Sequence, residues 1–114
     1  MVNVNFFIDA SDKPGVPQFL KTASVSENEL TLKWAEPEQD GGCDVIGYHV
    51  EIREASRRTW QRGGHVDATC ERAFTARSLK KNEKYVLRVA AENEVGVGEF
   101  AELPEPVLTK GKIG

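Results

Sequence analysis

The sequence of 114 residues is short of cysteine, of histidine and of long apolar runs, and each shortage excludes a class of protein. Two cysteines, Cys43 and Cys70, are too few for a disulfide-rich scaffold and lack C-x-x-C spacing, which favours a reduced, cytosolic setting. No apolar run approaches the roughly 20 residues that a membrane-spanning helix needs. The first residues lack a basic start, a long apolar stretch and a cleavage site, so we expect no export signal.

Basic residues are not in excess, which argues against a nucleic-acid partner. The 15 basic and 18 acidic residues leave a net charge of −3, whereas a protein that binds the phosphate backbone carries a basic surface. Apolar residues make up 39% and charged residues 29% of the chain, as in globular proteins rather than disordered ones. We therefore expect one domain that binds neither nucleic acid nor membrane.

Catalytic and metal-binding signatures are also missing. The two histidines are not accompanied by G-x-S-x-G, H-E-x-x-H or a phosphate-binding loop, so we expect no enzyme activity, no catalytic residue, no cofactor and no metal. His49 falls on the polar face of a predicted strand and is expected to be solvated, and His65 is expected in a loop. Cys43 and Cys70 are predicted near one pole. Two unrelated free thiols are favoured there over a disulfide or a shared metal site. A metal site that also used His65 would lack a fourth zinc ligand.

Four acidic residues crowd one loop, and we call this segment the acidic loop: Glu36, Glu38, Asp40 and Asp44. These carboxylates offer contacts to a cation or to a basic partner. The calcium-loop pattern of alternating oxygen ligands that ends in a bidentate glutamate is absent, however, so a solvated polar loop is favoured.

The first boundary lies at residues 11–17, where two prolines and a glycine within four residues interrupt regular structure. Residues 1–13 are therefore predicted to be an extension or a linker from a preceding domain, with an alternating segment at residues 2–6 that is compatible with a strand. The main domain is predicted over residues 14–110, followed by a C-terminal linker at 111–114.

Apolar and polar residues alternate in several short segments, with the period of a strand that has one buried face. The clearest alternations run over residues 29–35, 46–53 and 85–91. Weaker segments are predicted around Leu20 and Val25, at residues 59–62 closed by Gly63 and Gly64, at 74–76 and at 107–109. No window keeps a helical apolar face, so about seven short strands predict an all-β sandwich.

An ordered set of motifs runs along the predicted domain. It comprises Pro17 and Leu20, Trp34 with Pro37, Asp40-Gly41-Gly42, Ile46-Gly47-Tyr48-His49-Val50-Glu51, Leu79, Tyr85, residues 88–93 and Gly96-Val97-Gly98-Glu99. Each element is weak alone, but the ordered set resembles the fibronectin type III domain over residues 14–110. The resemblance implies a seven-stranded, immunoglobulin-like β-sandwich.

Particular residues acquire expected roles in such a fold. Trp34 offers a large apolar body to the gap between the sheets, and Tyr85 resembles the tyrosine corner, whose hydroxyl bonds to upstream backbone. Gly96 and Gly98 are expected to adopt positive φ at the hairpin between the last two strands. The predicted structural core is Trp34, Tyr48, Leu79, Tyr85 and Leu87.

The particular version of these motifs, including Trp60, looks like the domains of the titin and twitchin group of giant intracellular muscle proteins. This resemblance implies a non-catalytic module that serves as a load-bearing spacer in the sarcomere, within the cytoplasm, and that is monomeric as an isolated domain. Its implied partners are neighbouring domains of the same chain and muscle filament proteins. The alternative is an ectodomain module of a cell-adhesion or receptor protein, for which glycan sites or a W-S-x-W-S motif would be expected.

The candidate interaction surface combines an arginine-rich stretch with the predicted hairpin: Arg57, Arg58, Arg62, Asn93, Gly96 and Gly98. The arginines are suited to an acidic partner such as a filament surface. Arginines on an edge strand also discourage aggregation between sheets, and this second interpretation is favoured.

Overall fold

The computed structural model describes residues 11–110, which form eight strands and no helix. The strands are β1 (Gln18–Val25), β2 (Leu30–Ala35), β3 (Gly47–Glu54), β4 (Gln61–Asp67), β5 (Ala73–Ala76), β6 (Lys84–Asn93), β7 (Gly96–Glu102) and β8 (Val107–Leu108). Within these residues, nothing helical is long and apolar enough to cross a membrane. The predicted strand at residues 2–6 and the predicted linker at 111–114 lie outside the described residues.

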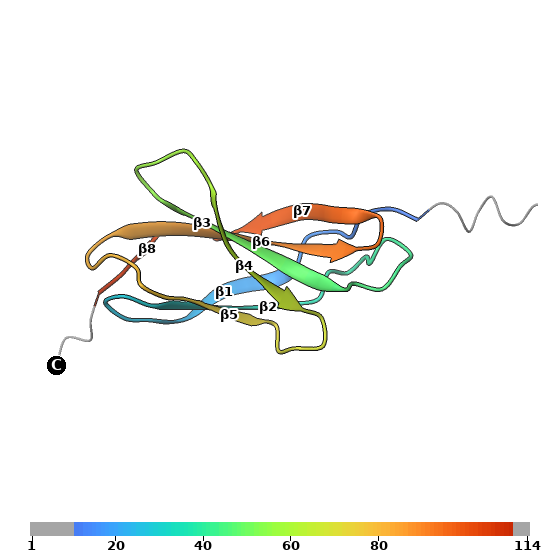
Figure 1. Cartoon of the computed structure of the whole chain (residues 1–114), viewed down its shortest axis with the longest axis horizontal. Helices are drawn as coiled ribbons and strands as arrows, with labels where there is room; N and C mark the ends of the chain where they lie inside the picture. Colours follow the sequence, from blue (N-terminus) through green and yellow to red (C-terminus); the bar gives the residue numbers. More distant parts are fainter. Residues whose placement is uncertain (1–10, 111–114) are drawn as a thin grey trace, which may run out of the picture.

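The strands form two antiparallel sheets that lie as two layers (Figure 1). One sheet has the order β1-β2-β5, and the other has the order β4-β3-β6-β7 with β8 paired to β6. The predicted all-β sandwich is therefore confirmed. The described chain starts at one end of the long axis and finishes at the other (Figure 1).

The strand count differs from the predicted seven because residues 96–102 form the additional strand β7 beside β6. This segment was missed because glycine and polar residues interrupt its apolar alternation. Hydrogen bonding to β6 supplies the order that its side chains do not indicate.

The core lies between the sheets and is built from alternate residues of the longer strands. Its buried side chains are Leu30, Leu32, Trp34, Tyr48, Val50, Val66, Ala76, Tyr85, Leu87, Val89, Ala91 and Leu103, while Leu79 is partly buried against them. Trp34 of β2 and Tyr48 of β3 meet edge to face across the two sheets, with ring centroids 5.4 Å apart. Burial of an aromatic ring of this size contributes about 3 kcal/mol.

The short strand predicted at residues 59–62 begins later and continues further in the structure. β4 runs through Gly63 and Gly64 to Asp67, so His65 belongs to a strand and its placement in a loop was wrong. Glycine is required at position 64 because an added Cβ would overlap the ring of Phe74. Ile46, predicted at the start of the β3 alternation, precedes β3 and is 51% exposed.

Tyr85 lies at the start of β6, in the larger sheet. Its ring is 6% exposed, and its hydroxyl oxygen accepts a hydrogen bond of 2.8 Å from the backbone N–H of Lys80. This contact is the tyrosine corner that the sequence predicted. It fixes the crossing between β5 and β6, because the four residues between donor and acceptor are held in one conformation.

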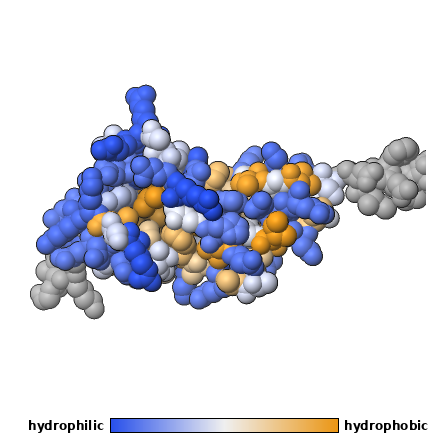
Figure 2. Space-filling model, in the orientation of Figure 1, coloured by the Kyte–Doolittle hydropathy of each residue, from blue (hydrophilic) through white to orange (hydrophobic). Residues whose placement is uncertain are grey.

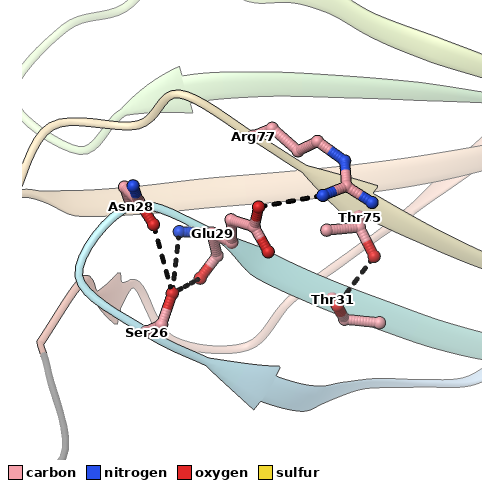
Figure 3. A network of polar contacts seen from close by, with 6 residues as sticks. All are labelled: Ser26, Asn28, Glu29, Thr31, Thr75 and Arg77. Carbon is pink, nitrogen blue, oxygen red and sulfur yellow. Dashed lines mark hydrogen bonds and ion pairs between the residues drawn. The ribbon is translucent and has the colours of Figure 1, made fainter.

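The smaller sheet is held laterally by polar contacts (Figure 3). Ser26 and Glu29 exchange hydrogen bonds across the β1–β2 turn, at 2.9 and 3.1 Å. Across β2 and β5, the hydroxyl oxygens of Thr31 and Thr75 lie 2.8 Å apart, and Arg77 pairs with Glu29 at 2.9 Å. These pairs keep the short strand β5 in register with β2.

Candidate functional site

The segment that leads into the domain is attached to the body of the sandwich. We call residues 11–17 the linker segment. The Asp12 N–H donates to the carbonyl oxygen of Gly41 at 2.8 Å, and the Gly15 N–H donates to that of Gln39 at 2.9 Å. Residues 11–13, predicted to lie outside the main fold, therefore contact it through backbone hydrogen bonds.

Asn93 at the end of β6 is the centre of this attachment. Its Nδ2 donates to the carbonyl oxygens of Asp12 at 2.7 Å and Asp40 at 2.8 Å. Its Oδ1 accepts from the N–H groups of Val95 at 2.9 Å and Gly96 at 3.2 Å. Both amide hydrogens and the carbonyl oxygen are thus satisfied, and the opposite amide orientation would place its oxygen against two other carbonyl oxygens.

The placement of Asn93 on an interaction surface was wrong, because the residue is only 1% exposed. It joins three segments that are far apart in the sequence. A buried amide with every hydrogen bond made is a structural clamp rather than a contact for a partner. We call the contacts of Asn93 with Asp12 and Asp40 the Asn93 clamp.

Two glycines make the close approach of the linker segment sterically allowed. A Cβ added at Gly41 would overlap the carbonyl group of Asp12, and Gly41 has a φ of 82°. A Cβ added at Gly98 would overlap the carbonyl group of Pro14. Positive φ was predicted for both hairpin glycines, but only Gly96 has it, at 155°. Gly98 instead provides space for the backbone that packs against it.

The arginine face lies on the β3–β4 connection and at the start of β4. We use this name for Arg57, Arg58 and Arg62, which are all exposed. The connection projects from the body in Figure 1, and Figure 2 shows hydrophilic atoms over the projection. Arg57 pairs with Glu54 at 3.4 Å, and Arg62 lies on β4, an edge strand of its sheet.

A stack of cationic and aromatic side chains supports the projecting connection. The guanidinium carbon of Arg88 lies 4.2 Å from the ring centroids of both Trp60 and Phe100, and that of Arg53 lies 4.9 Å from Trp60. Glu51 Oε1 accepts hydrogen bonds from Arg88 at 2.6 and 2.9 Å. Arg88 is therefore held by two aromatic rings and by Glu51, and its contact with Trp60 anchors the end of the β3–β4 connection.

The acidic loop does not present four free carboxylates. Glu36 pairs with Arg72 at 3.5 Å, and Asp40 Oδ1 accepts the N–H of Gly42 at 2.8 Å. Glu36, Asp40 and Arg72 line a surface hollow together with Tyr48. Burial raises the pKa of the Tyr48 hydroxyl. Mixed charge and turn hydrogen bonds suit a folded loop better than a cation site.

The two thiols do not form a bond, since Cys43 and Cys70 are both free cysteines in the structure. His49 also differs from the solvated residue that was expected. Its side chain is 29% exposed and its Nε2 lies 2.7 Å from Glu92 Oε1. No motif in the sequence indicated this contact, because its partner lies 43 residues away.

Comparison with protein-family models decides the family. The model described as "Fibronectin type III domain" matches residues 15–106. The chain belongs to the fibronectin type III domain family. The resemblance that its motifs indicated is therefore confirmed. The relatives of this fibronectin type III domain show which group within the family it is similar to.

Its similar proteins include several from muscle. It is 36% identical to titin from Drosophila melanogaster over 76% of this chain, and 31% identical to cardiac-type myosin-binding protein C from Mus musculus over 97% of this chain. The match covers 0% of the first relative, to the nearest per cent, and 9% of the second. The chain therefore spans less than a tenth of these relatives.

Solved structures agree on the fold and on the group. A crystal structure of titin domains has a TM-score of 0.80 and 34% identity, covering 88% of this chain and 33% of that chain. The twitchin kinase region from C. elegans has a TM-score of 0.80 and 29% identity, covering 88% of this chain and 17% of that chain. The predicted similarity to the titin and twitchin group is confirmed.

Proposed function

We propose that this chain is a non-catalytic structural and protein-interaction module of a giant sarcomeric protein, where it acts as a load-bearing spacer. Its similarity to domains of titin, twitchin and myosin-binding protein C supports this setting. The proposed location is the myofibril within the cytoplasm. The proposed partners are neighbouring domains of the same chain and muscle filament proteins, and the isolated domain is proposed to be monomeric.

The observation that carries this proposal is the Asn93 clamp. A module in a string of domains transmits force and orientation through its linkers, and a linker that hangs free transmits little orientation. Here the backbone at Asp12 is hydrogen-bonded both to Gly41 and to Asn93. The linker segment is thus continuous with the sandwich several residues before β1 begins.

The opposite end of the domain is secured as well. Thr109 is fully buried, its N–H donates to the carbonyl oxygen of Glu83 at 3.0 Å, and its own carbonyl accepts the Asn82 N–H at 2.8 Å. The linker segment and β8 approach opposite ends of the long axis (Figure 1). Tension between them acts along the strands, so that several hydrogen bonds of a ladder must shear together.

Interdomain angles in a tandem protein that includes the natural preceding domain test this role. We expect Asn93→Ala to widen the angular distribution, measured by residual dipolar couplings and small-angle scattering, because it releases Asp12 from the body. Asn28→Ala is the matched control, since Asn28 is exposed in the β1–β2 turn. An equal spread in all three proteins would contradict the proposed stiff linker.

Filament binding is proposed for the arginine face. Arg57 and Arg58 are exposed on the projecting connection, and Arg62 is exposed at the start of β4. All three can reach an acidic surface without any change in the sandwich. Co-sedimentation with muscle filaments tests this part of the proposal. We expect the double variant Arg58→Glu, Arg62→Glu to lose binding and Lys21→Glu, on exposed β1, to retain it. Equal binding by both variants would exclude the arginine face.

A further inference from the structure

Two histidines and a glutamate from three adjacent strands meet on the outer face of the larger sheet. His49 on β3 is directly opposite His65 on β4, and Glu92 on β6 is opposite Gly47 on β3. Directly paired residues share a face, as do residues two apart on a strand. The three side chains therefore lie on the face opposite to that of Tyr48, which is buried in the core.

The potential ligand atoms of these residues are close together. His49 Nε2 lies 2.7 Å and His65 Nε2 lies 3.8 Å from Glu92 Oε1, and one ligand atom from each residue lies within 4.8 Å of the others. Around a tetrahedral zinc ion with bonds of 2.0–2.1 Å, neighbouring ligand atoms are about 3.3 Å apart. Small side-chain rotations therefore bring all three atoms to coordination distance.

Gly47 makes this arrangement of the histidines sterically allowed. A Cβ added at Gly47 would lie 2.6 Å from His65 Nε2 and 2.8 Å from its Cε1. The imidazole of His65 thus occupies the space that a side chain at position 47 would fill. Its ring and that of His49 meet edge to face with centroids 4.9 Å apart.

A second carboxylate, that of Asp67, lies beside the cluster but already accepts hydrogen bonds. Asp67 is also opposite Gly47, but its Oδ1 accepts hydrogen bonds from the N–H of Thr69 at 2.9 Å and from the Thr69 hydroxyl at 2.7 Å. The protein therefore supplies three ligands and leaves one side open.

We propose that His49 Nε2, His65 Nε2 and a carboxylate oxygen of Glu92 bind one zinc ion, with water in the fourth position. Two imidazoles and one carboxylate are a ligand set that zinc accepts in three-ligand sites. Calcium and magnesium prefer oxygen ligands and fit this set poorly. The three side chains are 29%, 37% and 30% exposed, so an ion and its water reach the site from solvent.

The bound ion would join β4, β3 and β6 on the side away from the core. The three strands adopt this register only in the folded chain, so the site forms on folding and the ion stabilises the fold. Zinc is expected to raise the melting temperature of the wild-type chain. Magnesium at the same concentration is expected to leave it unchanged.

Calorimetric titration of the untagged chain with zinc chloride tests the site directly. We expect one ion per chain and a shift of both imidazole Cε1–H signals in NMR spectra, which are simple to assign because the chain has 2 histidines. Glu92→Gln should weaken binding by more than about tenfold, since loss of even an outer partner of a metal ligand costs that much. Gly47→Ala, which keeps every ligand, should weaken binding by displacing His65.

The double variant Cys43→Ser, Cys70→Ser is the matched control, because thiolates outside the proposed site also bind zinc. It should bind zinc as the wild type does. Loss of binding in this control, imidazole signals that zinc does not shift, or undiminished affinity in Glu92→Gln would each overturn the proposal. A ratio of one ion per two chains would also overturn it, since the site is contained in one chain.

Discussion

The side-chain amide of Asn93 donates a hydrogen bond of 2.7 Å to the carbonyl oxygen of Asp12, which lies 81 residues earlier in the chain. A second bond from the same nitrogen, of 2.8 Å, reaches the carbonyl oxygen of Asp40. One buried amide thus connects the linker segment, the loop before β3 and the end of β6. The position of the linker segment relative to the sandwich depends on this residue.

Replacing Asn93 should therefore destabilise the domain as well as release the linker segment. Asn93→Ala removes the hydrogen-bond partner of four backbone groups, which should lower the free energy of unfolding by about 2–3 kcal/mol. Chemical denaturation measures this loss. The exposed Asn28→Ala should stay within about 0.5 kcal/mol of the wild type, and an equal loss in the two variants would contradict the role of the clamp.

Trp34 is buried between the two sheets, at 6% exposure, and its ring packs against that of Tyr48. Trp34→Ala should cost about 3–5 kcal/mol, because it leaves a cavity against Tyr48. The partly exposed Trp60 is a matched control, and Trp60→Ala should cost clearly less. A loss below about 1 kcal/mol for Trp34→Ala, measured by denaturation, would show that this ring is not central to the core.

Tyr85 allows a test that leaves the core volume nearly unchanged. Tyr85→Phe removes only the hydroxyl that accepts the Lys80 N–H, so the free energy of unfolding should fall by about 1–3 kcal/mol. Thermal and chemical denaturation should agree on the loss. Unchanged stability would mean that water replaces the hydroxyl without cost, and the tyrosine corner would have no energetic role.

Glu54 should titrate below the usual range of a glutamate. The pKa of Glu54 is lowered chiefly by a hydrogen bond from Lys80, with a contribution from Arg57. A lowered folded-state pKa stabilises the fold above the pKa of the unfolded chain, and this stabilisation is lost as the pH falls through the folded-state value. NMR titration should show that Lys80→Gln raises the pKa of Glu54.

Asp67 is the internal control for that titration. Hydrogen bonds from Thr69 lower the pKa of Asp67, and Lys80 takes no part in them. The Asp67 titration should therefore be the same in the wild type and in Lys80→Gln. A Glu54 titration that does not respond to the variant would show that solvent screens the Lys80 contact fully.

Local periodicity was sufficient to predict the strands that build the core. Leu30, Leu32 and Trp34 alternate with polar residues in β2, and β6 repeats the pattern around Leu87 and Val89. A strand with one face in the core must alternate in this way, so the pattern is present in the sequence before any pairing is known. The family motifs then indicated how such strands are arranged.

Strands without alternation could not be predicted with the same success. β4 passes through Gly63 and Gly64, which resemble a turn in the sequence but are needed because the ring of Phe74 lies against the backbone there. β7 begins at Gly96 and contains Gly98, whose lack of a side chain admits the backbone of Pro14. In both strands the reason for glycine lies in a distant segment.

The sequence alone determined the sandwich, its family and the apolar residues between the sheets, because apolar burial depends on residue type and period. The tertiary structure decided the contacts of individual polar groups. Asn93 is buried only because the backbones of Asp12 and Asp40 converge on it. His49, His65 and Glu92 meet only through the register of three strands, since a shift of one residue in either pairing would turn a side chain to the other face.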